Sequence, residues 1–167
     1  VAQERNAHAA LAQLQDEITA VRQRPGSNLP PDFTQFRAQL AEQLRLAPDM
    51  LPFVSQIRIA SDAAKGCVAR LAGTEIPKFE DNEATLDELR ERIRKTLDYI
   101  GSVSAAQVDG SEGRDIVIPM RPPREPVQMK GQFFLQHWAL PNFYFHVTTA
   151  YALLRHAGVE LGKGDYL

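Results

Sequence analysis

A long aromatic segment close to the C-terminus, residues 132–158, constrains the fold more than any other part of the chain. It contains six of the aromatic rings contributed by 8 Phe and 4 Tyr, together with the only Trp and three of the 4 His. Gly158 stands where a helix needs a left-handed C-cap residue. The spacing of the apolar residues after Pro141 is typical of a helix that buries one face. That stripe consists of Phe143, Val147, Ala150, Leu154 and Ala157.

Three further long helices are predicted from the same periodicity, with apolar stripes that run over residues 7–21, 53–71 and 86–100. The first is polar and carries only a narrow heptad seam, so we expect it to contact one neighbour. The second carries an unbroken apolar stripe. We expect Asp49 to cap its N-terminus and Gly73 to end it.

The third helix begins with the pattern of a capping box, in which Thr85 and Glu88 satisfy each other's backbone N–H groups. Between the third helix and the aromatic segment, residues 115–120 and 126–130 read as two short strands around a Pro-rich turn. The predicted fold class is therefore all-α. It is a four-helix bundle with one long crossover, interrupted by a small β-hairpin between helices three and four.

Charged residues on the predicted helices are expected to be solvated. Arg58, Asp62 and Lys65 have the spacing of surface ion pairs, and residues 90–95 form a polar face of mixed sign. Cys67 falls on the apolar stripe of the second helix, so we expect a buried and unreactive thiol.

Composition excludes several classes of function. A net charge of -2 without a basic cluster argues against nucleic-acid binding. No uncharged apolar run approaches the roughly 20 residues that span a bilayer, so no membrane partner is expected. A single cysteine excludes an internal disulfide and a multi-cysteine zinc site. No signal peptide is recognisable, and we expect a cytoplasmic protein of one domain, residues 1–167.

No familiar catalytic motif is present, which leaves His146 as the main candidate for a functional residue. It lies beside the apolar stripe, one turn after Asn142, and Gln56 can reach it if helices two and four are neighbours. Three interpretations remain open for His146: a satisfied core residue, a ligand-binding or catalytic residue, and a metal ligand. We predict a pocket in which His146 is catalytic, as a general base or hydrogen-bond donor, while Gln56, Asn142 and His137 bind ligand. Carboxamides are weak zinc ligands, so no metal and no cofactor are predicted.

Several longer segments resemble the DUF1993 family, an uncharacterised family related to the DinB/YfiT-like four-helix bundles and their metalloenzymes. The resemblance covers residues 44–167, whereas residues 1–43 form an atypical N-terminal helix and connector. The segments that carry it are RLAPDMLP at 45–52, QIRIASDAAK at 56–65, ARLAG at 69–73, the stretch 139–159 and LGKGDYL at 161–167.

What the resemblance implies is a bundle and a pocket position rather than a metal. DinB-like relatives include thiol-dependent transferases and metal-dependent hydrolases, commonly with three His ligands. His146 matches one of these ligands, but Asn142 stands in the place of the second, and no His occurs at residues 56–59, where the third is expected. Such bundles are often homodimers. The alternatives to a small-molecule site are therefore a non-catalytic dimerising scaffold and a metal-dependent hydrolase or thiol transferase with a non-standard site.

Overall fold

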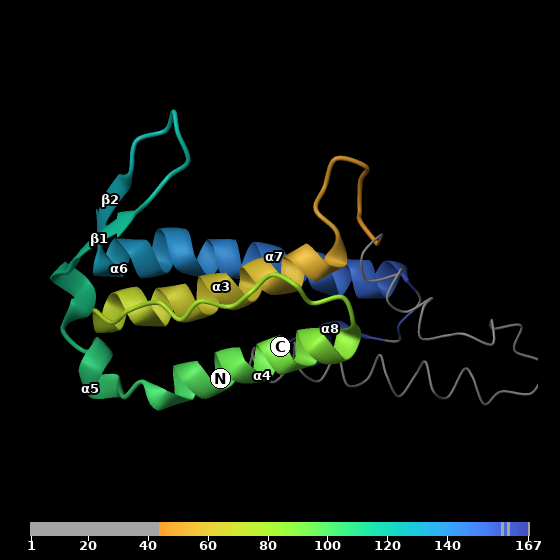
Figure 1. The fold of residues 1–167 in the computed structure, drawn as a ribbon, viewed down its shortest axis with the longest axis horizontal. Coiled ribbons are helices and arrows are strands. Elements are labelled where there is room, and N and C mark those ends of the chain that lie inside the picture. Colours follow the sequence, from red (N-terminus) through yellow and green to blue (C-terminus); the bar gives the residue numbers. More distant parts are fainter. Residues whose placement is uncertain (1–43, 158, 160, 167) are drawn as a thin grey trace, which may run out of the picture.

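The computed structural model of the protein describes residues 44–157, 159 and 161–166. Three long helices dominate this part: α3 (Phe53–Ala72), α4 (Leu86–Ser102) and α7 (Leu140–His156). In Figure 1, α3 lies between α7 and α4, and it packs against both. The helix predicted over residues 7–21 and the predicted C-cap at Gly158 lie outside the described residues.

Shorter elements complete the described chain. They are α5 (Ala105–Val108), η1 (Ser111–Gly113), β1 (Asp115–Ile118), β2 (Val127–Lys130), α6 (Gly131–Phe134), the π-helical turn η2 (Leu135–Ala139) and α8 (Lys163–Tyr166). The described residues are thus mostly helical with a small two-stranded sheet. No helix among them combines the length and the apolar character needed to cross a bilayer.

The helix α3 ends as predicted but starts later than expected. Gly73 adopts the left-handed conformation, with φ of 71°, and its N–H bonds back to the carbonyl of Arg70. The prediction that Asp49 caps the N-terminus is wrong, because Pro52 occupies that position in an extended conformation. A proline disfavours helical geometry in the residue before it, so Leu51 cannot continue a helix into Pro52.

The predicted capping box of α4 is confirmed. The backbone N–H of Glu88 donates to Thr85 Oγ1 at 3.2 Å, and the backbone N–H of Thr85 donates to Glu88 Oε2 at 2.8 Å. These bonds satisfy donors that have no partner inside the helix. The sequence signal fixes the start of α4 because the residues that make the cap are adjacent in the chain.

The main hydrophobic core lies where α3, α4 and α7 meet. Each long helix buries part of its apolar stripe there, and the segment after α7 adds two more side chains. On α7 the stripe differs from the prediction, because Leu153 is fully buried and Ala157 is exposed. The buried members are Phe53, Val54, Ile57, Leu86, Leu89, Ile93, Ala150, Leu153, Leu154, Val159 and Leu161. Burial of this apolar surface is the main force that holds the three helices together.

The predicted hairpin is confirmed. β1 and β2 pair antiparallel, with Asp115 opposite Lys130, and the two side chains form an ion pair at 2.8 Å. Ile116 and Ile118 point to the protein interior, where they join a second hydrophobic cluster with Phe134 of α6. A two-stranded sheet is only marginally stable alone, so this cluster is what anchors the hairpin.

The aromatic segment is one nearly continuous helix that starts ten positions before Pro141, at Gly131, and includes the π-helical turn η2. Pro141 explains the π turn. It has no N–H to donate to the carbonyl of His137, and its ring needs space beside that carbonyl. A π turn accommodates one extra residue and gives the ring this space.

Candidate functional site at His146

The side chain of His146, on α7, lies inside the protein and pairs with Gln56 of α3. Its Nδ1 is 2.7 Å from Gln56 Oε1. The exposed fraction is 8% for His146 and 2% for Gln56. The two helices therefore bring together two buried polar side chains as a hydrogen-bonded pair.

The amide of Gln56 determines which ring nitrogen of His146 carries the proton. Gln56 Nε2 donates to the backbone carbonyl of Leu51 at 2.9 Å, which fixes the amide so that Oε1 faces the imidazole. Because Oε1 only accepts hydrogen bonds, Nδ1 must be the donor. In the neutral ring, Nε2 then has a free lone pair.

Burial keeps this imidazole neutral. Desolvation lowers the pKa of His146 from its ordinary value of 6.5, because the buried cation loses contact with water. Gln56 is uncharged, so it stabilises an imidazolium much less than a carboxylate would, and desolvation dominates. At neutral pH, Nε2 is therefore an unprotonated acceptor, the form needed for a general base.

The second ring nitrogen of His146, Nε2, makes no hydrogen bond within the described residues. Nδ1 is the His146 atom that hydrogen-bonds there. Because 8% of His146 is exposed, the residue as a whole keeps some contact with solvent.

The other two predicted site residues lie apart from this pair. Asn142 is exposed, and no hydrogen bond joins it to His146 or Gln56 among the described residues. His137 is exposed as well, and its ring packs against Phe133 at 4.6 Å between centroids. The residues that the structure brings together are thus His146 and Gln56.

Two residues beside the pair were not predicted from the sequence. The ring of Phe145 meets the imidazole of His146 edge to face, with centroids 5.1 Å apart. Leu51 accepts the bond from Gln56 through its carbonyl. Both side chains are more than half exposed, at 57% for Phe145 and 51% for Leu51. The sequence signal that could have revealed Leu51 is the proline that follows it. Because Pro52 keeps Leu51 out of the helix, the Leu51 carbonyl is free to accept a hydrogen bond from a side chain of α3.

An apolar cavity lies elsewhere in the molecule. It has a volume of about 70 Å³, lies among α3, α4, α7 and the C-terminal segment, and is almost entirely apolar. Representative lining residues are Ile57, Ile93, Phe143, Val147 and Tyr166. His146 is not among the residues that line it. The buried pair of His146 and Gln56 is therefore separate from this cavity.

The residues around His146 do not fit the three-histidine metal site of DinB-like relatives. Gln56 occupies the α3 side, and its amide oxygen is already bonded to the imidazole. Within the described residues, no three His, Cys, Asp or Glu side chains are grouped closely enough to hold a metal ion. A single imidazole nitrogen with carboxamides is a poor donor set for zinc.

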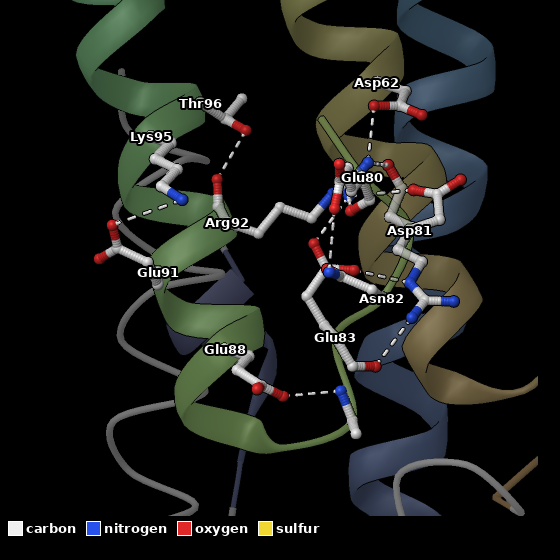
Figure 2. Close-up of polar contacts among 12 residues, drawn as sticks. Asp62, Glu80, Asp81, Asn82, Glu83, Glu88, Glu91, Arg92, Lys95 and Thr96 are labelled. Carbon is white, nitrogen blue, oxygen red and sulfur yellow. Dashed lines mark hydrogen bonds and ion pairs between the residues drawn. The ribbon is translucent and has the colours of Figure 1, made fainter. Parts of the chain in front are cut away.

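A second polar cluster surrounds Arg92 of α4, where the sequence prediction was wrong. Arg92 was expected on a solvated face, but only 2% of it is exposed. Figure 2 shows its side chain reaching across from α4 toward α3 and the connector between them. Its guanidinium bonds to Glu83 at 2.8 Å, to Asp62 at 2.8 Å and to Asp81 at 3.0 Å.

The neighbours of Arg92 on α3 are also less solvated than predicted. Lys65 is 5% exposed, bonds to Asp62 at 2.6 Å and lies over the ring of Phe79. Arg58 bonds to Glu83 at 2.8 Å. The connector, residues 74–84, brings the acidic and aromatic partners that the helix pattern could not reveal. The network fastens this connector across α3 and α4.

Hydrogen bonds within this network keep the Glu83 side chain ionised. Burial alone would raise the pKa of Glu83, because it disfavours the carboxylate. Bonds from Arg92, the backbone and Arg58 outweigh that effect and hold the pKa below its ordinary value of 4.5. At neutral pH, Glu83 is therefore an anion that accepts bonds from both guanidinium groups.

The Cys67 thiol fits its predicted structural role. It is half-buried and packs against the second hydrophobic cluster. Burial raises the pKa of this thiol to about 11, and the nearby Arg70 only partly offsets the effect. At neutral pH the group is a thiol rather than a thiolate, so it is a weak nucleophile.

Comparison with known proteins gives a family and a fold. The chain matches the family described as "Domain of unknown function (DUF1993)" over residues 31–167, which begins before residue 44, where the resemblance was expected to start. It is similar to the crystal structure of a DinB family member protein from Shewanella denitrificans. The TM-score is 0.77 at 36% identity, over 99% of this chain and 87% of that chain. The comparison with curated proteins gave no match. The chain therefore belongs to the DUF1993 family, whose function is unknown, and has a DinB-like fold.

Proposed function

We propose that His146 is the working residue of a small-molecule site, where Nε2 accepts a hydrogen bond or a proton from a small polar molecule. The single observation that supports this most is the Nδ1 contact with Gln56 at 2.7 Å. That contact leaves Nε2 with its lone pair free. Buried polar atoms usually have a hydrogen-bond partner, so a ring nitrogen left unpaired by the described residues is available to a ligand.

In a reaction, Gln56 would be a positioning residue and His146 the general base. A proton from an O–H, N–H or S–H group of the ligand would move to Nε2. The imidazolium formed would keep its Nδ1–H on Gln56 Oε1. Because burial disfavours the cation, the ring would readily return the proton to a product or to water.

Nitrogen NMR of the His146 side chain tests this proposal without knowledge of the natural ligand. Methanol and acetamide, which donate hydrogen bonds, are expected to shift the Nε2 resonance, whereas acetonitrile, which only accepts them, is not. His146→Asn is the matched variant, because its amide nitrogen can replace Nδ1 as donor to Gln56 while Nε2 is lost. If neither donor moves Nε2 while the fold is intact, the small-molecule site is refuted.

A second candidate function is a dimerising scaffold without catalysis. The observation that favours it is the exposed ring of Phe145, since a contact that removes this apolar ring from water is favourable. A second copy of the chain would cover this ring. Sedimentation across a range of concentrations tests this alternative, and Phe145→Ser should shift the equilibrium toward the monomer. A monomer at all concentrations rules it out.

For the fold, we propose that a fourth helix completes a bundle, and that the heptad segment at residues 7–21 supplies it. The apolar cavity among α3, α4 and α7 supports this, because a helix with an apolar seam could cover its apolar lining. In the full chain, Leu14→Glu should lower the melting temperature and increase binding of an apolar dye. Gln13→Glu, off the seam, should do neither. Equal behaviour of the two variants contradicts this proposal.

A further inference from the structure

Two exposed apolar residues, Phe145 in contact with His146 and Leu51 bonded to Gln56, indicate what kind of molecule the site would take. We propose that the ligand is amphipathic and uncharged. It would carry one hydrogen-bond donor for Nε2 and a ring or branched apolar body that lies against Phe145 and Leu51. This inference rests on the proposed function and specifies its ligand class.

The apolar part of the inference follows from where the two side chains lie. Phe145 touches the imidazole of His146 edge to face, and Leu51 is bonded through its carbonyl to Gln56. Each exposed side chain is thus attached to one member of the polar pair. Leu51 is linked to the pair through its backbone, whereas the ring of Phe145 contacts the imidazole itself, so the apolar body of a ligand on the imidazole would extend first over Phe145. Covering their exposed surface is favourable, and an aromatic body gains further from the ring of Phe145.

The uncharged part follows from the bonding around the pair. Within the described residues, the hydrogen bonds of His146 and Gln56 go to each other and to the backbone of Leu51. No charged side chain bonds to either residue in that part of the chain. An anion would meet the Nε2 lone pair, and a cation would find no carboxylate, so either would lose hydration without compensation.

Benzyl alcohol and methanol form a suitable probe pair, because both present an alcohol O–H and differ by the phenyl ring. The Nε2 resonance of His146 reports binding of each. We expect benzyl alcohol to bind roughly tenfold more tightly than methanol. Phe145→Ala should remove most of this preference, and Leu51→Ala should reduce it. Phe133→Ala is the matched control, since Phe133 is 56% exposed but packs on His137 instead.

The outcomes separate this inference from the proposed function. If both alcohols shift Nε2 with equal affinity, the ligand class is wrong while the small-molecule site stands. If neither shifts Nε2, both fail. If the preference for benzyl alcohol survives both Phe145→Ala and Leu51→Ala, the apolar surface lies elsewhere and the inference is overturned. The same holds if Phe145 is covered by a second copy, seen as dimerisation that benzyl alcohol does not disturb.

Discussion

His146 and Gln56, which are 90 positions apart in the chain, form a hydrogen-bonded pair of 2.7 Å between α7 and α3. The pair is more than a contact between helices, because Gln56 is itself held by the carbonyl of Leu51. The carbonyl before α3 thus fixes the amide, the amide fixes the imidazole tautomer, and the tautomer determines the chemistry available at Nε2.

Removal of the carboxamide should destabilise the protein. In Gln56→Leu, the buried Nδ1–H of His146 and the carbonyl of Leu51 both lose their partner. An unpaired buried polar group costs about 1–3 kcal/mol, so we expect a loss of that size in the free energy of unfolding. Chemical denaturation measures it. Combining Gln56→Leu with His146→Leu should recover part of the loss, because the unpaired donor is then gone. An undiminished loss in the double variant contradicts this assignment.

Gln56→Glu should reverse the charge preference of His146. A carboxylate at the position of Oε1 attracts an imidazolium, whereas the amide does not. The pKa of His146, which burial holds below its ordinary value in the wild type, should therefore rise in this variant. Titration of the His146 ring by NMR gives both values. A pKa that stays depressed would show that the introduced carboxylate does not face the imidazole.

The stability of the wild-type protein should fall as the pH drops below 6.5. The folded pKa of His146 lies below this ordinary value, so the unfolded chain takes up a proton before the folded protein does. The contribution of the neutral His146 to the free energy of unfolding is fully present above pH 6.5. It is lost as the pH falls toward the folded pKa, and the free energy of unfolding then changes by up to about 1.4 kcal/mol per pH unit. His146→Asn keeps the bond to Gln56 but cannot titrate. The free energy of unfolding of His146→Asn should lack this pH dependence. If the pH dependence is unchanged in the variant, a group other than His146 causes it.

How far the sequence predicts this fold depends on whether partners are near one another in the chain. The cap of α4 is predicted correctly because Thr85 and Glu88 are three positions apart and act on the same turn. The hairpin is also predicted correctly, because its two strands follow one another in the chain and are joined by a short Pro-rich turn. The start of α3 is not, because Pro52 overrides the capping preference of Asp49 through its effect on Leu51.

The charged residues show where such reasoning fails. Helical spacing assigned Arg92 to a solvated face, because the spacing describes one helix and contains no information about an irregular connector. The connector between α3 and α4 places Glu83 and Asp81 around the guanidinium and removes it from water. The pairing of His146 with Gln56 was predicted on the condition that helices two and four are neighbours, which they are. The exposure of Asn142 and His137 was not predicted.

Arg92 should contribute far more to stability than its neighbour Arg94. Both lie on α4 and both form ion pairs, but the Arg92 side chain is 1% exposed and that of Arg94 is 55% exposed. Arg92→Met leaves the acidic side chain of Glu83 without its main partner, so we expect a loss of about 3 kcal/mol in the free energy of unfolding. Arg94→Met should cost less than about 1 kcal/mol. Similar losses in the two variants would mean that the network is not buried in solution.

Gly131, at the junction of the hairpin and α6, should tolerate no side chain. A Cβ at this position would lie 2.0 Å from the backbone oxygen of Ser111, and a backbone atom cannot move aside as a flexible side chain can. We expect Gly131→Ala to cost about 1–3 kcal/mol and to loosen the contact between η1 and α6. Gly101→Ala is the matched control, because a Cβ there meets nothing within 4 Å. Gly101 lies in α4, where alanine is favoured over glycine by roughly 0.5–1 kcal/mol, so this variant should be more stable than the wild type. Thermal unfolding of the two variants should therefore move in opposite directions, and a stabilised Gly131→Ala would contradict the close approach of Gly131 to Ser111.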